Sequence, residues 1–366
     1  MNIISRACSS YGRYQKGIGL IELLISMVVG LLVMAGVVQL FSTTTQNANA
    51  NAGISRIQEN TRYAFSRIVE DISQSGSLGC MSSPSVIRNS RDASEPIVEN
   101  LLGVAGVPVA DNSLYDYLTI INGFSSLTDN LSGDATNGTD ILRVRYLDHA
   151  VRIKVNTLDS RTQVTLDTTG ANSDFIDTLD VGDVVGVSNC ARAAIFVLTS
   201  KPSSSTGIVS ITTGDVSNIY NAKLDMKLGS FPSSSSRSDF TLAKYSQFYL
   251  YAGDSGAYEY FIGDSPLGEC NVTTAQQNCS LFRRKGGVKE EIVQGVHNME
   301  VQYGTTDSAG SLTYQNAAAV TDWRSVDRLK ITMMFNSIEN AQASGNNLSS
   351  LITKEVTRTI NLYNQL

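Results

Sequence analysis

Residues 18–41, IGLIELLISMVVGLLVMAGVVQLF, form an apolar run in which Glu22 is the only ionisable side chain. At a helical rise of about 1.5 Å per residue the run extends for roughly 36 Å, which exceeds the hydrocarbon thickness of a bilayer, about 30 Å. It is therefore predicted to be a transmembrane helix. A carboxylate within a bilayer costs at least about 2.5 kcal/mol unless it is protonated, paired or close to the interface. We therefore interpret Glu22 as a functional residue. The alternative is an interfacial glutamate in a plain membrane anchor.

The segment before this run, residues 1–17, carries Arg6, Arg13 and Lys16 but no acidic residue. A basic flank of this kind stays in the cytoplasm, so the chain after the helix is predicted to face outward. No small-residue cleavage site of a secretory signal follows the apolar run. What stands out instead is the pair Lys16-Gly17 directly before it.

The sequence KGIGLIELL at residues 16–24 resembles the type IV prepilin signal. The resemblance implies that a prepilin peptidase cuts between Gly17 and Ile18, that the new N-terminus of Ile18 is methylated, and that the apolar helix is kept. Ile18 and Gly19 depart from the commonest residues of that signal, which are Phe or Met and then Thr. An amine freed at Ile18 is a natural partner for Glu22 of a neighbouring subunit in a fibre, so Glu22 is expected to set the assembly register.

Residues 42–76 lack proline, so the helix can continue beyond the membrane. Apolar residues recur there at helical spacing, and most charged residues, including Asp71, lie off their stripe. The stripe comprises Ile54, Ile57, Ala64, Phe65, Ile68 and Ile72. We predict an amphipathic continuation of the helix, packed on the outer part of the protein and stopped by Gly76 and Gly79.

The outer part, residues 77–366, is predicted to be mainly antiparallel β, which makes the whole chain an α+β, pilin-like protein. Short β-branched or aromatic segments, several with period-two alternation, are separated by Gly, Asn, Asp and Ser. They lie at 141–147, 151–156, 162–168, 181–189, 193–199, 246–252, 258–263, 280–285, 298–304 and 328–336. The serine-rich stretch at 231–238 is either a boundary between two lobes or a long hairpin tip. Trp323 and Tyr314 are interpreted as partial core.

Five cysteines become informative once the leader is assigned. Cys8 leaves with it, and Cys80, Cys190, Cys270 and Cys279 remain on the oxidising side of the membrane. An even set indicates two disulfides with three possible connectivities, of which we favour Cys270–Cys279 and Cys80–Cys190. A zinc site is the competing interpretation, but no C-x-x-C pair is present. We expect neither a metal nor a cofactor.

Charge and motifs argue against nucleic acid and catalysis. The chain has 28 basic and 34 acidic residues, and the leader would remove only basic ones. The basic cluster of Arg283, Arg284 and Lys285, beside Gly286-Gly287, is interpreted as a solvated turn, and DNA is not expected as a partner. No hydrolase, metalloprotease, P-loop or dinucleotide motif occurs, and only two histidines are present, so no enzyme is predicted. The acidic residues interpreted as surface or turn residues are Asp174, Asp177, Asp180, Asp183, Glu290 and Glu291.

Several further blocks look like the successive blocks of PilW-type minor pilins. They are ENTRYAFSRIVEDISQSGSLGC, VGDVVGVSNCARAAIFVLT, EEIVQGVHNMEVQYG, DRLKITMMFN and VTRTINLYNQL. The resemblance implies an inner-membrane subunit that joins other minor pilins and the major pilin, primes pilus assembly and stays near the tip, where a large tip adhesin is a further partner. Two alternatives remain: a pseudopilin of a type II secretion system, and an anchored periplasmic binding domain that is not cut at Gly17.

Overall fold

The computed structural model describes most of the chain outside its first residues and several internal stretches. The described residues are 19–77, 79, 98–100, 102–104, 121–125, 135–136, 138–147, 151–160, 163–188, 193–210, 214–216, 219–221, 249–252, 256–266, 268–270, 278–285, 288–338 and 351–362.

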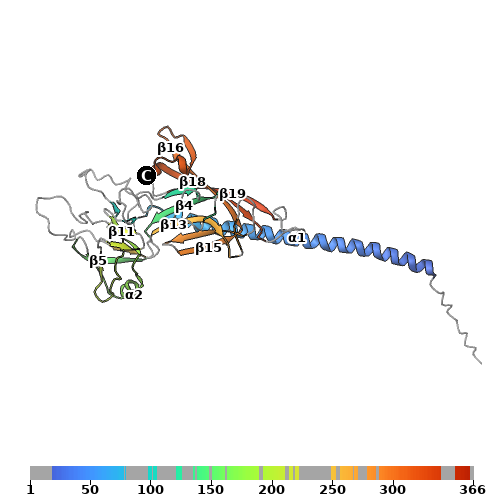
Figure 1. Cartoon of the computed structure of the whole chain (residues 1–366), viewed down its shortest axis with the longest axis horizontal. Helices are drawn as coiled ribbons and strands as arrows, with labels where there is room; N and C mark the ends of the chain where they lie inside the picture. The colour runs from blue at the N-terminus through green and yellow to red at the C-terminus, as the bar shows by residue number, and fades with distance from the viewer. Residues whose placement is uncertain are drawn as a thin grey trace, which may run out of the picture.

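One helix, α1, runs without interruption from Leu20 to Gln74. The predicted continuation beyond the apolar run is therefore confirmed. Gly76, with φ 72°, follows the end of the helix, and its N–H donates to the carbonyl of Arg145 at 2.9 Å. A left-handed φ at this place is the usual helix-terminating role of glycine. Figure 1 shows that the N-terminal half of α1 projects away from the β part of the molecule.

The C-terminal half of α1 packs on two antiparallel sheets. The five-stranded sheet has the order β15-β14-β13-β4-β3, and the four-stranded sheet has the order β17-β16-β18-β19. Their strands are β3 (Ile121–Ser125), β4 (Asp140–Tyr146), β13 (Gly256–Asp264), β14 (Cys279–Lys285), β15 (Val288–Gln294), β16 (Val296–Thr306), β17 (Leu312–Asn316), β18 (Val326–Asn336) and β19 (Thr353–Asn361). We call α1 and these two sheets the pilin body.

A second group of strands lies at the end of the molecule opposite the projecting helix (Figure 1). A seven-stranded sheet has the order β1-β8-β7-β12-β5-β6-β9, and a three-stranded sheet has the order β10-β11-β2. The strands are β1 (Val98–Asn100), β2 (Leu102–Val104), β5 (Val151–Ser160), β6 (Gln163–Leu166), β7 (Val184–Ser188), β8 (Ala193–Val197), β9 (Ile208–Ser210), β10 (Gly214–Val216), β11 (Ile219–Asn221) and β12 (Tyr249–Ala252). Together with the short helix α2 (Ala171–Thr178) they form what we call the distal unit. Its pair β1–β8 is parallel, and its other described pairs are antiparallel.

The buried apolar side chains fall into separate clusters. The main cluster joins α1 residues such as Ile68 to both sheets of the body, and Trp323 packs against it with its ring edge-on to Tyr303. A second cluster lies within the distal unit and includes Ile153, Val187 and Leu250. The expectation that Trp323 is partial core is confirmed, and Tyr314 is likewise only half-buried.

Every predicted β segment contains a strand, whereas the helix stripe needs two corrections. Ile54 was expected on the buried stripe, but 42% of it is exposed, because it lies on a different side of α1 from the buried Gly53 and Ile57. Asp71 was expected off the stripe, but it is buried at 2% exposure because partners from three strands converge on it. The segment 231–238 lies outside the described residues, so the predicted lobe boundary there stays a prediction.

Candidate functional site: an exposed helix and its anchor

The first half of α1 exposes nearly all of its apolar side chains. Leu20, Leu32 and Phe41 are 80%, 69% and 74% exposed, and none of the apolar window of the helix is buried within the protein. The helix is long and apolar enough to cross a membrane. An apolar surface of this length needs a partner, which is either lipid or other apolar helices.

Glu22 lies in the first turn of α1, next to the N-terminal end of the helix. Its backbone N–H donates to the carbonyl of Gly19 at 2.9 Å, and Ser26 Oγ donates to the carbonyl of Glu22 at 2.7 Å. The side chain is exposed, so it is available to a group outside this chain. The positive end of the helix dipole favours a carboxylate in this turn. Gly17 and Ile18, the predicted cleavage site, lie outside the described residues.

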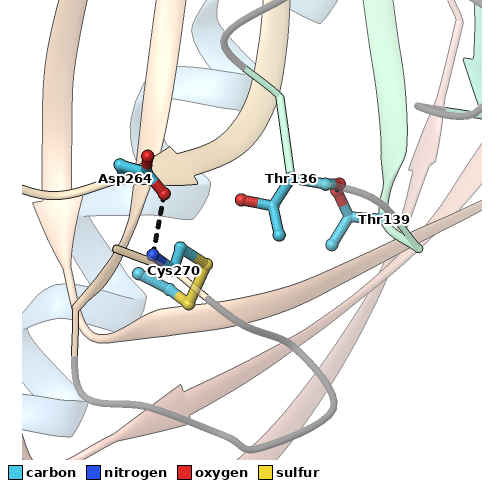
Figure 2. Close-up of a disulfide and its surroundings, with 5 residues drawn as sticks. Thr136, Thr139, Asp264 and Cys270 are labelled. Atoms are coloured by element: carbon cyan, nitrogen blue, oxygen red, sulfur yellow. Dashed lines mark hydrogen bonds between the residues drawn. A yellow bond between two sulfur atoms is a disulfide. The ribbon is translucent and has the colours of Figure 1, made fainter. Parts of the chain in front are cut away.

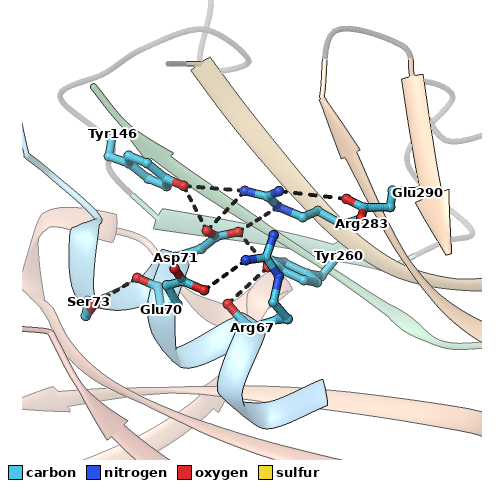
Figure 3. A network of polar contacts seen from close by, with 8 residues as sticks. All are labelled: Arg67, Glu70, Asp71, Ser73, Tyr146, Tyr260, Arg283 and Glu290. Atoms are coloured by element: carbon cyan, nitrogen blue, oxygen red, sulfur yellow. Dashed lines mark hydrogen bonds and ion pairs between the residues drawn. The ribbon is translucent and has the colours of Figure 1, made fainter. Parts of the chain in front are cut away.

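The opposite end of α1 is fixed to the body through Asp71, whose carboxylate is surrounded by donors from three strands (Figure 3). Arg283 on β14 donates from Nε to Oδ2 at 2.8 Å and from Nη2 to Oδ1 at 3.1 Å. Tyr146 on β4 donates to Oδ1 at 2.8 Å, and Tyr260 on β13 donates to Oδ2 at 2.5 Å. A buried carboxylate is stable only when it is paired and hydrogen-bonded in this way. We call these four residues the helix anchor.

The electrostatics of the helix anchor follow from burial and from one carboxylate. Burial, and then the negative charge of Asp71, raise the pKa of both Tyr146 and Tyr260 well above its ordinary value. Burial lowers the pKa of Arg283, but Asp71 and the neighbouring tyrosines together outweigh this effect, so the net shift is upward. Both tyrosines therefore remain hydrogen-bond donors, and Arg283 remains charged.

A second buried ion network lies on the same five-stranded sheet. Two of its residues, Glu259 and Arg284, are the sequence neighbours of Tyr260 and Arg283 of the helix anchor. Glu259 on β13 accepts from Arg143 Nε at 2.9 Å and from Arg284 Nε at 2.7 Å, and both guanidinium groups also donate through Nη2. Burial raises the pKa of Glu259, but the two arginines outweigh it, so the pKa is lowered overall. Arg143 is 2% exposed, so the network ties β4, β13 and β14 together within the sheet.

These two networks correct the interpretation of residues 283–285 as a solvated turn. Arg283 and Arg284 lie within β14, and Arg283 also stacks over the ring of Tyr258 at 4.1 Å. Both charges are paired inside the protein, because Asp71 on α1 binds Arg283 and Glu259 on β13 binds Arg284. Sequence reasoning missed the anchor, although one signal was available. Arginines recur inside the apolar segments ILRVRYL and SLFRRK, where strands buried on both faces would require internal partners.

A disulfide joins Cys270 to Cys279, the pairing that we favoured for these two cysteines. Cys279 is fully buried at the start of β14, and the backbone N–H of Cys270 donates to Asp264 Oδ1 at 2.7 Å (Figure 2). Cys80 and Cys190 lie outside the described residues, so their pairing stays a prediction.

The remaining acidic candidates lie mainly at the surface. Asp174, Asp177 and Asp180 are exposed, and Lys201 forms an ion pair with Asp180 at 3.0 Å. Asp183 accepts from the backbone of Asp180 in a turn. Glu290 is 62% exposed on β15, and Glu291 beside it is half-buried. Within the described part of the chain, no group of three or more His, Cys, Asp or Glu side chains is arranged to hold a metal ion.

Two protein families match this chain. Residues 12–38 match the prokaryotic N-terminal methylation motif, and residues 259–362 match the type IV pilus-assembly protein W family, PilW. The first match covers the region of the predicted cleavage site and Glu22, and the second covers the body from β13 to the end of β19. No curated protein and no solved structure matches the chain.

A long apolar N-terminal helix, a methylation motif and a mainly antiparallel β domain define a type IV pilin-like protein. The matches to PilW and to the methylation motif support a type IV pilus minor pilin of the PilW family. The family consists of structural pilus subunits, and its methylation motif implies contact with the prepilin peptidase and with other pilins. The motif and the exposed helix fit a protein anchored in the inner membrane.

Proposed function

We propose that this protein joins other minor pilins in a complex that primes pilus assembly, and that it stays near the pilus tip. In this proposal the prepilin peptidase cuts between Gly17 and Ile18 in the cytoplasm, and the amine of Ile18 is methylated. The outer domain lies in the periplasm and later at the cell surface. The proposed partners are other minor pilins, the major pilin and a large tip adhesin. The match to PilW favours a pilus over a type II secretion system.

The observation that carries this proposal is the exposed apolar half of α1 with Glu22 in its first turn. Lipid covers this surface before assembly, and apolar helices of neighbouring subunits replace the lipid in a fibre. Because a carboxylate in such surroundings requires a counter-charge, a neighbour shifted along the fibre is expected to supply one from the amine of its own Ile18. Glu22 then selects one axial position among those that apolar packing alone would allow.

The helix anchor supports the same proposal from the other end of α1. Asp71 is bound by donors from β4, β13 and β14. The sheet that contains these strands therefore moves together with α1 when the helix enters a fibre. Asn60, which lies N-terminal to Asp71 on α1, adds a further contact: its Nδ2 donates to the carbonyl of Gln294 at 3.0 Å. The position of α1 would thereby determine where the outer domain lies in the tip complex.

The test is the variant Glu22→Ala, with Glu70→Ala as the matched control on the same helix. Glu70 is exposed and pairs with Arg67 within α1. We expect Glu22→Ala to insert normally into the membrane but to co-isolate with the other minor pilins about tenfold less or worse, since loss of a charge-assisted hydrogen bond costs about 1.5–3 kcal/mol. Glu70→Ala should behave as the wild type. Wild-type co-isolation of Glu22→Ala would contradict the proposal.

A further inference from the structure

The strands β4 and β13 are neighbours in the five-stranded sheet, although a long stretch of chain separates them. They pair antiparallel from Leu142 opposite Tyr260 to Tyr146 opposite Gly256. Tyr146 ends β4 and Gly256 begins β13, so the two strands are the arms of a hairpin whose connection is the whole segment 147–255. The five-stranded sheet of the pilin body is therefore continuous across the point where this segment leaves and returns, because β4 and β13 pair directly with each other.

The departing and returning chains also pair with each other inside the distal unit. Val151 on β5 stands opposite Ala252 on β12, and this second ladder continues to Lys154 opposite Tyr249. Residues 147–150 on one side and 253–255 on the other separate the two ladders. The same two chain segments thus pair antiparallel on both sides of the junction, and residues 147–255 leave and re-enter the body through two neighbouring strands.

Among the described residues, the apolar interior of the distal unit contains no side chain of the body. Its apolar cluster combines Ile153 and Leu250 from the two attaching strands with side chains of β6, β7, β8 and β9 and of α2. No residue of α1 or of the strands of the body belongs to this cluster. Among the described elements, all pairs with extensive contact lie either within the body or within the distal unit. The segment matched by PilW, 259–362, lies in the body.

The contacts at the junction are local. The backbone N–H of Leu147 donates to the carbonyl of Ser77 at 2.7 Å, and the side chain of Leu147 lies against Gly186 of β7. Gly79 lies under the ring of Tyr251 on β12. These contacts hold the attaching strands next to the end of α1, but they do not merge the two apolar clusters.

We propose that residues 147–255, which supply most of the distal unit, are a module inserted into a hairpin of the pilin body, and that the distal unit unfolds separately from the body. The short edge strands β1 and β2, from residues 98–104, add to the sheets of the module from outside the insertion. The body keeps its fold when the module is unfolded. This inference concerns the architecture of the chain and does not rest on the proposed function.

The test uses thermal unfolding of the full-length mature protein in detergent, with two probes. Trp323 is the sole tryptophan and packs on the body, so its fluorescence reports unfolding of the body, whereas far-UV circular dichroism reports both parts. The variants are Leu250→Ala in the distal cluster and Leu281→Ala in the cluster of the body, and both side chains are fully buried. A buried Leu→Ala change should lower the midpoint of its own unit by about 5–15 °C.

We expect Leu250→Ala to shift a circular dichroism transition and to leave the Trp323 transition unchanged, and Leu281→Ala to shift the Trp323 transition. If Leu250→Ala lowers the Trp323 midpoint as much as Leu281→Ala does, the chain is one cooperative unit and the proposal is wrong. A second variant replaces residues 147–255 by an Asn-Gly turn, which suits a two-residue hairpin connection. It should retain the Trp323 transition and the Cys270–Cys279 disulfide, and loss of that transition would overturn the claim that the body folds without the module.

Discussion

Arg283 binds Asp71 through two hydrogen bonds, at 2.8 and 3.1 Å, and this contact joins the last turns of α1 to strand β14. The two residues are 212 positions apart in the sequence, and Asp71 is only 2% exposed. This contact, together with the apolar cluster around Ile68, fixes the position of α1 relative to the two sheets of the body.

Removing the charge of Asp71 should destabilise the protein strongly. Asp71→Asn leaves Arg283 without its buried counter-charge, which typically costs about 3–5 kcal/mol. Glu70→Gln, next to it, breaks only an exposed pair with Arg67 and should cost about 1 kcal/mol or less. Denaturant unfolding followed by Trp323 fluorescence gives both values. Equal effects of the two variants would show that the helix anchor does not stabilise the fold.

The Glu259 network predicts a pH dependence. The folded-state pKa of Glu259 lies below its ordinary value of 4.5 because two arginines outweigh the effect of burial. Its contribution to stability is therefore fully present above about pH 4.5 and is lost as the pH falls through the lower, folded-state pKa.

Glu259→Gln should remove this contribution and flatten the fall of the unfolding free energy in acid. It should also destabilise the protein at neutral pH, since Arg143 is then left buried with a weaker partner. Glu355→Gln, exposed on β19, is the control. The measurement is the free energy of unfolding between about pH 7 and about pH 3. An acid profile of Glu259→Gln that parallels the wild type would refute the assignment.

Loss of the Cys270–Cys279 disulfide should destabilise the body moderately. The bond closes a short loop with a sequence separation of 9, for which loop entropy predicts about 2–3 kcal/mol. Cys270→Ser should lower the denaturant midpoint below that of the oxidised wild type, and reduction of the wild type, which would also break the predicted Cys80–Cys190 bond, should lower it at least as far. A reduced wild type as stable as the oxidised protein would argue against this contribution.

Gly79 should tolerate no side chain. Its φ is 75°, and a Cβ there would overlap the ring of Tyr251, so an alanine meets both backbone strain and a clash. Gly138, with φ 90° and nothing within 4 Å of a Cβ, isolates the strain alone. Gly138→Ala should cost about 1–2 kcal/mol, and Gly79→Ala should cost clearly more. Equal melting temperatures for the two variants would mean that the ring of Tyr251 moves aside freely.

The local patterns of the sequence predicted the elements of this fold well. Several strand segments alternate between apolar and polar side chains, and the helix has a stripe at positions such as Ile57, Phe65 and Ile72, because each pattern reflects neighbours along the same element. The exposed helix and Glu22 were also predictable, since a lone carboxylate in an apolar run stands out without any tertiary information.

The helix anchor and the inserted module could not be predicted in this way. Asp71 is polar in a helix and Arg283 stands near two glycines, so each fits a solvated position when only its neighbours in sequence are considered. What buries them is the meeting of α1, β4, β13 and β14, which are far apart in the chain. The hairpin between Tyr146 and Gly256 is hidden for the same reason, because strand pairing across a long insertion leaves no local signal.

The central claim is that the mature chain begins at Ile18 and uses its amine in assembly. Mass spectrometry of the N-terminal peptide of the protein isolated from sheared pili tests this claim most directly. We expect a chain that starts at Ile18 and carries an N-terminal methyl group, and we expect the Gly17→Ala variant to keep residues 1–17 and to be missing from the fibres. A chain that starts at Met1 and is nevertheless present in fibres would contradict the account.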